Sequence, residues 1–215
     1  MDVLVFSLLM FVGSILAGFL GSLTGLGGGI VIVPLLTVVF GVDIRYAIGA
    51  SLVSVIATSS GAASAYVKEG FSNMRIGMFL EVATTIGAIA GAAIALLINA
   101  SAIAVIFGLV LLYSAYMSNR SKPADIDNFP EDHLATKLKM NGSYPTPEGE
   151  KSYKVRRVPF GFAIMFIAGI LSGLLGIGSG AVKVLAMDNV MSIPFKVSTA
   201  TSNFMIGGQG NTQEH

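Results

Sequence analysis

Long, continuous runs of apolar residues most constrain what this chain can fold into. A helix that crosses a membrane needs about 20 mainly apolar residues. The runs that approach or reach this length are residues 3–23, 46–67, 76–98, 102–117 and 160–177. They are not interrupted by polar residues at every second position, as membrane strands would be, so they predict helices. The first run starts without a basic residue and is too long for a signal peptide, so we interpret it as a permanent span.

The composition supports a membrane protein and excludes several classes of soluble protein. Of the 215 residues, 53% are hydrophobic and only 12% are charged, whereas soluble globular proteins are about 25% charged. The chain has no Cys, and no paired acids, catalytic triad or metal-binding cluster is visible in the sequence. We therefore expect no enzyme, no cofactor and no metal site. The net charge of +1 argues against nucleic acid, and the expected surroundings are a lipid bilayer.

The few charges are concentrated in one segment. Residues 118–158 hold 14 of the 25 charged residues. This divides the chain into a first transmembrane repeat (1–117), a polar loop (118–158) and a partial second transmembrane repeat (159–215). Basic residues are present in segments 68–75 and 118–158 but not in the turn at 99–101. The positive-inside rule therefore places both basic segments in the cytoplasm and favours an N-terminus outside.

An internal repeat is the most informative motif. Residues 17–33 and 168–184 are identical at nine of 17 positions, at a spacing of 151 residues. The shared core is Gly-x-Gly-x-Gly, at Gly25, Gly27 and Gly29 and again at Gly176, Gly178 and Gly180. With one gap, residues 49–51 align with residues 199–201. The fold class predicted from these features is all-α: a polytopic transmembrane helix bundle built from two repeats with glycine-broken hairpins.

Glycine-broken, short apolar segments at matching positions of two repeats point to a binding site near the middle of the membrane. Glycines that break a helix free N–H groups at its end, and these groups suit an anion. The alternative is that the glycines only permit a tight turn between packed helices. Small residues such as Gly87 and Gly91 are interpreted as packing residues that let neighbouring helices approach.

Lys183 is the sharpest single candidate, because a charge at membrane depth usually faces a cavity and has a function. It stands where the first repeat has Ile32. One interpretation makes it the partner of a substrate anion; the other makes it a lysine that reaches an interface. Glu81 is interpreted as an interfacial residue, with a proton-relay or cation-coupling role as the alternative.

The remaining candidates are glycines, hydroxyls and one amide. Neutral donors can hold an anion that has lost its water, although such groups also join helices by hydrogen bonds. The full set of predicted substrate-binding residues is Gly25, Gly27, Gly28, Gly29, Ser51, Gly176, Gly178, Ser179, Gly180, Lys183, Thr201 and Asn203.

These residues resemble the sulfite exporter TauE/SafE family, also called TSUP permeases. The first half carries the Gly-Leu-Gly-Gly-Gly hairpin, Val33-Pro34 and Ala-Ile-Gly-Ala-Ser at 47–51. The second half carries Gly-Ile-Gly-Ser-Gly at 176–180 and a similar stretch at 194–203. The resemblance implies a multi-pass permease of the plasma membrane that moves small inorganic or organosulfur anions, such as sulfite, thiosulfate or organosulfonates.

The resemblance also implies a length. Family members usually continue for two or more spans beyond a stretch like residues 202–207, so we expect this chain to be truncated at its C-terminus. The alternative function is accordingly a non-transporting membrane scaffold or an inactive truncated fragment. The sequence leaves open the exact substrate, the direction of transport, the coupling ion and whether the protein is a homo-oligomer.

Overall fold

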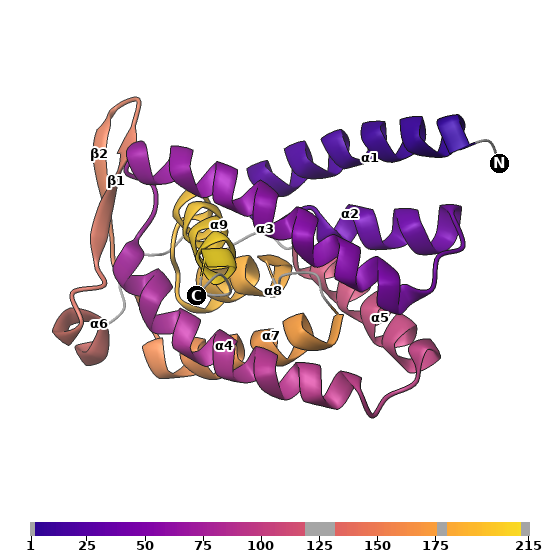
Figure 1. Cartoon of the computed structure of the whole chain (residues 1–215). Coiled ribbons are helices and arrows are strands. Elements are labelled where there is room, and N and C mark those ends of the chain that lie inside the picture. Colours follow the sequence, from indigo (N-terminus) through magenta and orange to yellow (C-terminus); the bar gives the residue numbers. More distant parts are fainter. Residues whose placement is uncertain (1–2, 119–131, 176–179, 212–215) are drawn as a thin grey trace.

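The computed structural model describes residues 3–118, 132–175 and 180–211, and almost all of them lie in helices (Figure 1). The elements of the first part are α1 (Val3–Thr24), α2 (Gly29–Pro34), the π-helical turn η1 (Leu35–Val39), α3 (Ile44–Lys68), α4 (Met74–Ala95) and α5 (Ala100–Ser118). Those of the second part are α6 (His133–Lys137), β1 (Gly142–Thr146), β2 (Gly149–Tyr153), α7 (Val158–Leu175), α8 (Gly180–Leu185), the π-helical turn η2 (Ala186–Val190) and α9 (Phe195–Asn211).

Five helices of this described part, α1, α3, α4, α5 and α7, are long and apolar enough to cross a membrane. They coincide with the predicted runs to within a few residues, which confirms the all-α membrane fold. Polar residues cap the N-termini of two of these helices. The side chains of Asp43 and Asn73 accept backbone N–H groups in the first turns of α3 and α4.

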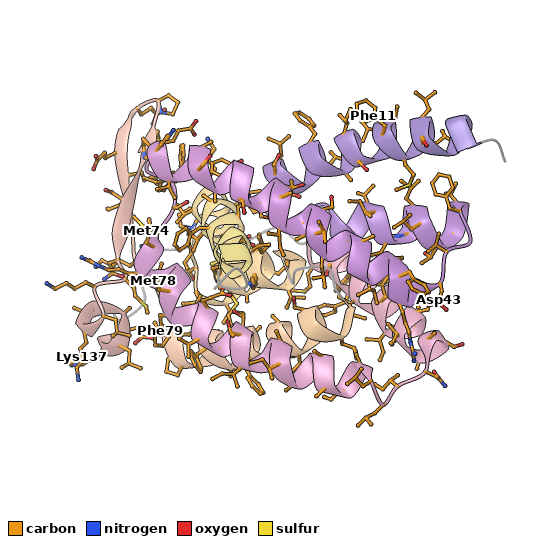
Figure 2. All side chains as sticks on the ribbon, viewed as in Figure 1. Phe11, Asp43, Met74, Met78, Phe79 and Lys137 are labelled. Atoms are coloured by element: carbon orange, nitrogen blue, oxygen red, sulfur yellow. The ribbon has the colours of Figure 1, made fainter. Side chains whose placement is uncertain are left out.

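Apolar side chains also cover the outside of the bundle. Phe11 on α1 is 65% exposed and Ile89 on α4 is 68% exposed. Figure 2 shows such side chains projecting outward from α1, with carbon-rich sticks around α4. An apolar exterior of this extent suits lipid rather than water.

The polar segment, predicted as a loop, contains a short helix and two strands. Residues 132–153 form α6 and an antiparallel hairpin in which Gly142 pairs with Tyr153 and Thr146 with Gly149. Asp132 begins α6 and also accepts the backbone N–H of Val158, 2.9 Å away, at the start of α7. Burial raises the pKa of Asp132, but backbone N–H donors outweigh it and hold that pKa below its usual value. The segment is thus tied to the helix that follows it.

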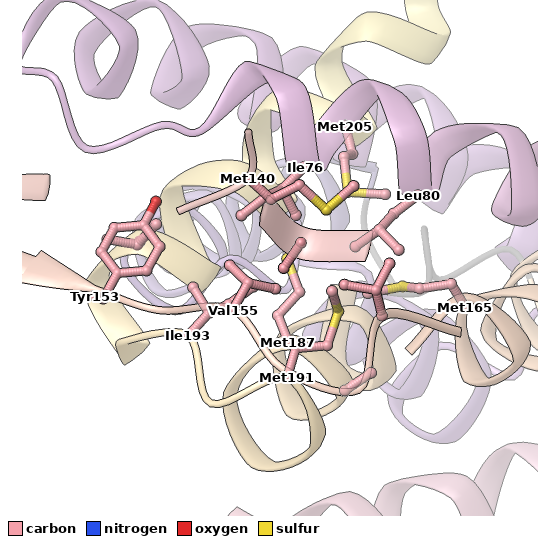
Figure 3. Packing of buried hydrophobic residues seen from close by; sticks show 14 of the residues in the cluster. Ile76, Leu80, Met140, Tyr153, Val155, Met165, Met187, Met191, Ile193 and Met205 are labelled. Atoms are coloured by element: carbon pink, nitrogen blue, oxygen red, sulfur yellow. The ribbon is translucent and has the colours of Figure 1, made fainter. Parts of the chain in front are cut away.

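A buried apolar cluster joins this segment to the membrane helices. Figure 3 shows Met140 of the polar segment beside Ile76 of α4, and Tyr153, Met187 of η2 and Met191 directly after η2 belong to the same cluster. The Nδ2 of Asn73 donates to the carbonyl of Met140 at 2.9 Å. Segments 68–75 and 132–158 therefore lie at the same end of the molecule, as the topology prediction requires.

Helices α4 and α7 pack backbone against backbone. A Cβ at Gly87 or Gly91 would overlap a carbonyl oxygen of α7, and one at Gly169 or Gly173 would overlap a carbonyl oxygen of α4. Only glycine leaves room for this approach. The predicted packing role of Gly87 and Gly91 is confirmed.

The repeat is visible in the element boundaries. Helices α2 and α8 begin at Gly29 and Gly180, and α3 and α9 begin at Ile44 and Phe195, always 151 residues apart. Backbone hydrogen bonds recur at the same spacing: Phe40 to Leu35 and Met191 to Ala186, Val42 to Leu36 and Ile193 to Met187, Ala47 to Asp43 and Ser198 to Pro194.

This constant spacing corrects one part of the predicted alignment. The gap that matched residues 49–51 with residues 199–201 is wrong, because the hydrogen bonds keep the spacing of 151 on both sides of it. Small residues are frequent in both helices, so a shifted match arises easily. In the corrected register Ser51 corresponds to Ser202, and both are fully buried.

The two repeats are inverted with respect to each other. The first hairpin begins and ends at the end of the molecule that holds the α4–α5 turn, since Arg45 Nη2 donates to the carbonyl of Ile98 at 3.0 Å (Figure 1). The second hairpin begins and ends at the opposite end, where Arg156 N donates to the carbonyl of Met191 at 3.1 Å. Opposed repeats with interrupted helices are a common plan of secondary transporters.

Candidate functional site

Glycines in the left-handed backbone region build the first helix break. Gly25, Gly27 and Gly28 have φ angles of 72°, 76° and 77°, a region that L side chains rarely adopt. The break is also crowded, because a Cβ on Gly27 would lie 2.6 Å from a methyl carbon of Val55. Gly29 follows directly as the first, buried residue of α2.

Not all amide groups of this break are free for a ligand. The N–H groups of Leu26 and Gly27 both donate to the carbonyl of Gly21, at 3.1 and 3.3 Å. The expectation that the glycines free amide groups is therefore wrong for these two, because they complete the C-terminal end of α1.

The first break packs directly against the second repeat. A Cβ on Gly180, at the start of α8, would overlap the carbonyl oxygen of Gly25, and one on Gly25 would lie 2.9 Å from the carbonyl oxygen of Thr199. Ser202 Oγ donates to that same Gly25 carbonyl at 2.9 Å, and Asn203 Nδ2 donates to the carbonyl of Ser22 at 3.0 Å. The structure thus brings Gly25, Gly180 and Asn203 together.

Other predicted site residues lie elsewhere or cannot be placed. Thr201 Oγ1 accepts the backbone N–H of Asn73 at 3.1 Å, so it helps begin α4. Ser51 is buried on α3 and already has an interaction partner. Gly176, Gly178 and Ser179 lie outside the described residues.

Several polar atoms near the breaks are buried without a hydrogen-bond partner in the described part of the chain. They include Ser59 Oγ, Thr199 Oγ1, Asn203 Oδ1 and Lys183 Nζ. Ser59 faces Gly27, and Thr199 faces Gly25. Since buried polar groups are nearly always paired, by protein, ligand or water, unpaired ones mark a place where a polar ligand or water fits.

Lys183 is completely buried on α8. Its Nζ lies 3.6 Å from Oε2 of Glu81 on α4, a carboxylate whose side chain keeps 23% of its surface exposed. The interpretation of Lys183 as a lysine reaching the interface is contradicted by this burial. Sequence reasoning missed the pair, although both residues are isolated charges inside apolar segments and each needs a counter-charge.

A pocket opens at the end that carries the polar segment. Its volume is about 380 Å³, and it is lined by Leu23, Tyr66, Phe71, Phe195, Lys196 and Thr199. Lys196 Nζ lies 6.0 Å from the centre of the Phe71 ring, within range of a cation–π contact. No sequence pattern indicates this pocket, because its walls come from the ends of α1 and α3, a loop and the start of α9.

Inverted repeats with broken helices that meet around buried polar groups characterise the class of secondary transporters. The sequence matches the profile of the family described as Sulfite exporter TauE/SafE over residues 10–208. The chain belongs to this family of multi-pass membrane transporters.

Curated relatives have matching descriptions. The chain is 34% identical to the "Probable membrane transporter protein YunE" of Bacillus subtilis (strain 168), over 89% of this chain and 71% of that protein. It is 26% identical to the "Probable membrane transporter protein YdhB" of the same organism, over 93% and 72%. It is 28% identical to a "Probable membrane transporter protein" of Xylella fastidiosa (strain 9a5c), over 95% and 71%. No solved structure matches the chain.

Proposed function

We propose that this protein carries a small anion across the plasma membrane, and that the anion is a sulfur oxyanion or an organosulfonate. The observation that carries the proposal is Lys183, a fully buried cation without a hydrogen-bond partner among the described residues. Burying a charge at membrane depth costs free energy, so such a charge usually has a function. An anion beside Lys183 would supply the missing charge-assisted hydrogen bond.

The pocket supports the proposal by offering a route from water. Lys196 gives its wall a positive charge, and Thr199 extends from the pocket to the glycine break at Gly25. Two phenylalanines, a tyrosine and a leucine line the rest. Such a wall accepts both an inorganic oxyanion and one with a short organic part. The family description, a sulfite exporter, favours sulfur as the central atom.

Transport by the purified protein in proteoliposomes tests this function. Vesicles loaded with unlabelled thiosulfate, sulfate, sulfite or sulfoacetate should accumulate the corresponding labelled anion by counterflow. Empty vesicles and vesicles holding chloride alone serve as controls. Counterflow with none of these anions would exclude the proposed substrate class and favour a non-transporting scaffold.

Membrane orientation is part of the same proposal, with the polar segment in the cytoplasm. In whole cells, a cysteine at Ser143→Cys, on the exposed side of β1, should resist a membrane-impermeant thiol reagent. The matched variant Leu97→Cys, in the exposed α4–α5 turn at the opposite end, should react. The chain has no cysteine of its own, so the labelling is unambiguous. The reverse pattern would invert the topology.

A further inference from the structure

The ion pair has one fully buried member and one that is partly exposed. Lys183 has no exposed surface, whereas the Glu81 side chain, 3.6 Å away, is 23% exposed. Glu81 Oε1 also accepts the hydroxyl of Thr85 at 3.5 Å. The carboxylate can therefore exchange a proton at its exposed part, but the ammonium group can exchange its partner only within the protein.

The pair is neutral as it stands, so an added monovalent anion, such as a sulfonate, would leave one uncompensated negative charge in the bundle. Burying an uncompensated charge costs several kcal/mol. A proton bound together with the anion removes this cost, because a protonated Glu81 is neutral and Lys183 is then paired with the anion. For a monovalent anion the total charge of the site therefore stays zero throughout.

We propose that Glu81 couples anion transport to protons, a proposal that rests on the proposed function. The anion displaces the Glu81 carboxylate from Lys183, and the carboxylate takes up one proton from water by forming an O–H bond. When the anion leaves, Glu81 releases the proton and pairs with Lys183 again. Anion and proton thus move in the same direction, and no electrons are transferred.

The other charged groups on the elements around Lys183 do not compete for this role. Helices α5 and α7 contain no charged residue. Asp188 on η2 is buried but has interaction partners of its own. Lys196 on α9 lines the pocket, and Arg75 at the start of α4 donates to the carbonyl of Lys139 at 3.2 Å. Within the described chain, Glu81 is the acid at ion-pair distance from Lys183.

Calorimetric titration of the purified protein tests the coupling. Methanesulfonate is a suitable probe because it is a fully ionised monoanion near neutral pH, so any proton taken up goes to the protein. Titrations in two buffers of different ionisation enthalpy count protons per anion bound. We expect about one proton per anion and an affinity that rises about tenfold for each pH unit lowered.

The variants Glu81→Gln and Glu148→Gln locate the proton. Glu81→Gln should still bind the anion, with no proton uptake and with an affinity independent of pH. Glu148→Gln, which removes an exposed acid in the turn between β1 and β2, should behave like the unaltered protein. If Glu81→Gln is too unstable to purify, the double variant Glu81→Gln/Lys183→Met removes both charges together and should bind the anion weakly, again without protons.

The outcomes separate this inference from the proposed function. Anion binding by the unaltered protein without proton uptake would overturn the coupling and leave the transport function standing. Proton uptake that persists in Glu81→Gln would overturn the assignment to this residue. If neither the titration nor the counterflow assay detects any of the anions, the proposed function fails, and the coupling fails with it.

Discussion

The two glycine-broken hairpins share their helix boundaries and π-helical turns but bury different side chains. Their helices begin at the same spacing, and their π-helical turns repeat the same hydrogen bonds. At matching positions, however, the first hairpin buries Ile32 and the second buries Lys183. The second hairpin also lies deeper in the bundle, since 44% of the span in α7 is buried against 11% in α1.

This difference distinguishes the features shared by both hairpins from the charge that only the second hairpin carries. The glycine breaks and the π-helical turns belong to both copies, so they are needed for the architecture. The charge belongs to one copy, the one enclosed by α4, where Glu81 can balance it. An apolar first hairpin faces lipid at no electrostatic cost. We therefore propose that the chemistry lies in the second repeat, and the following variants test this proposal.

The most severe test is to place a charge in the first hairpin. Ile32 packs in an apolar cluster with Val33, Leu36 and Leu175. Ile32→Lys would bury a cation there without a counter-charge and should lower the free energy of unfolding by about 3–5 kcal/mol. Thermal unfolding in detergent measures the effect, and Ile32→Met, of similar volume, should cost less than about 1.5 kcal/mol. Equal stability of the two variants would mean that water reaches the first hairpin.

A slightly smaller loss is expected where the hairpins touch. In Gly180→Val the new side chain would overlap the carbonyl oxygen of Gly25, and a backbone contact relaxes poorly. We expect a loss of about 3 kcal/mol. Gly49→Ala is the matched control, since a Cβ there meets nothing within 4 Å, and it should leave the melting temperature unchanged or raise it. Tolerance of Gly180→Val would show that the hairpins are not in firm contact.

Removing the charge of the second hairpin should weaken binding rather than folding. Lys183→Met keeps the length of the side chain, and the Glu81 side chain is partly exposed and also accepts the hydroxyl of Thr85. A charge-assisted hydrogen bond contributes about 1.5–3 kcal/mol, so anion affinity should fall about tenfold or more. Lys183→Arg should give an intermediate loss, and Lys137→Met, on the exposed side of α6, none. Unaltered affinity in Lys183→Met would make the lysine purely structural.

The sequence predicts the fold much better than the site. Apolar runs reveal the spans, and the glycine motif reveals the repeat, because both depend on local composition. The predicted residues Gly25, Gly180 and Asn203 do lie together. The Lys183–Glu81 pair and the pocket depend on how α4, α8 and α9 cross. Such contacts leave no periodic signal in one sequence, although two lone charges in apolar segments were a usable hint.

The smallest effect concerns the junction between the polar segment and α4, away from both hairpins. Burial raises the pKa of Tyr153 above its ordinary value of 10.0, and its hydroxyl oxygen accepts Asn73 Nδ2 at 2.8 Å. Because Tyr153 ionises at a lower pH in the unfolded chain than in the folded one, the stability contributed by its neutral hydroxyl is complete below about pH 10. This stability is lost as the pH rises through the higher pKa of the folded state. Tyr153→Phe should remove that decline and cost about 1 kcal/mol at neutral pH. Unfolding curves between pH 8 and pH 11 measure both effects, and an alkaline decline that persists in Tyr153→Phe would assign it to another group.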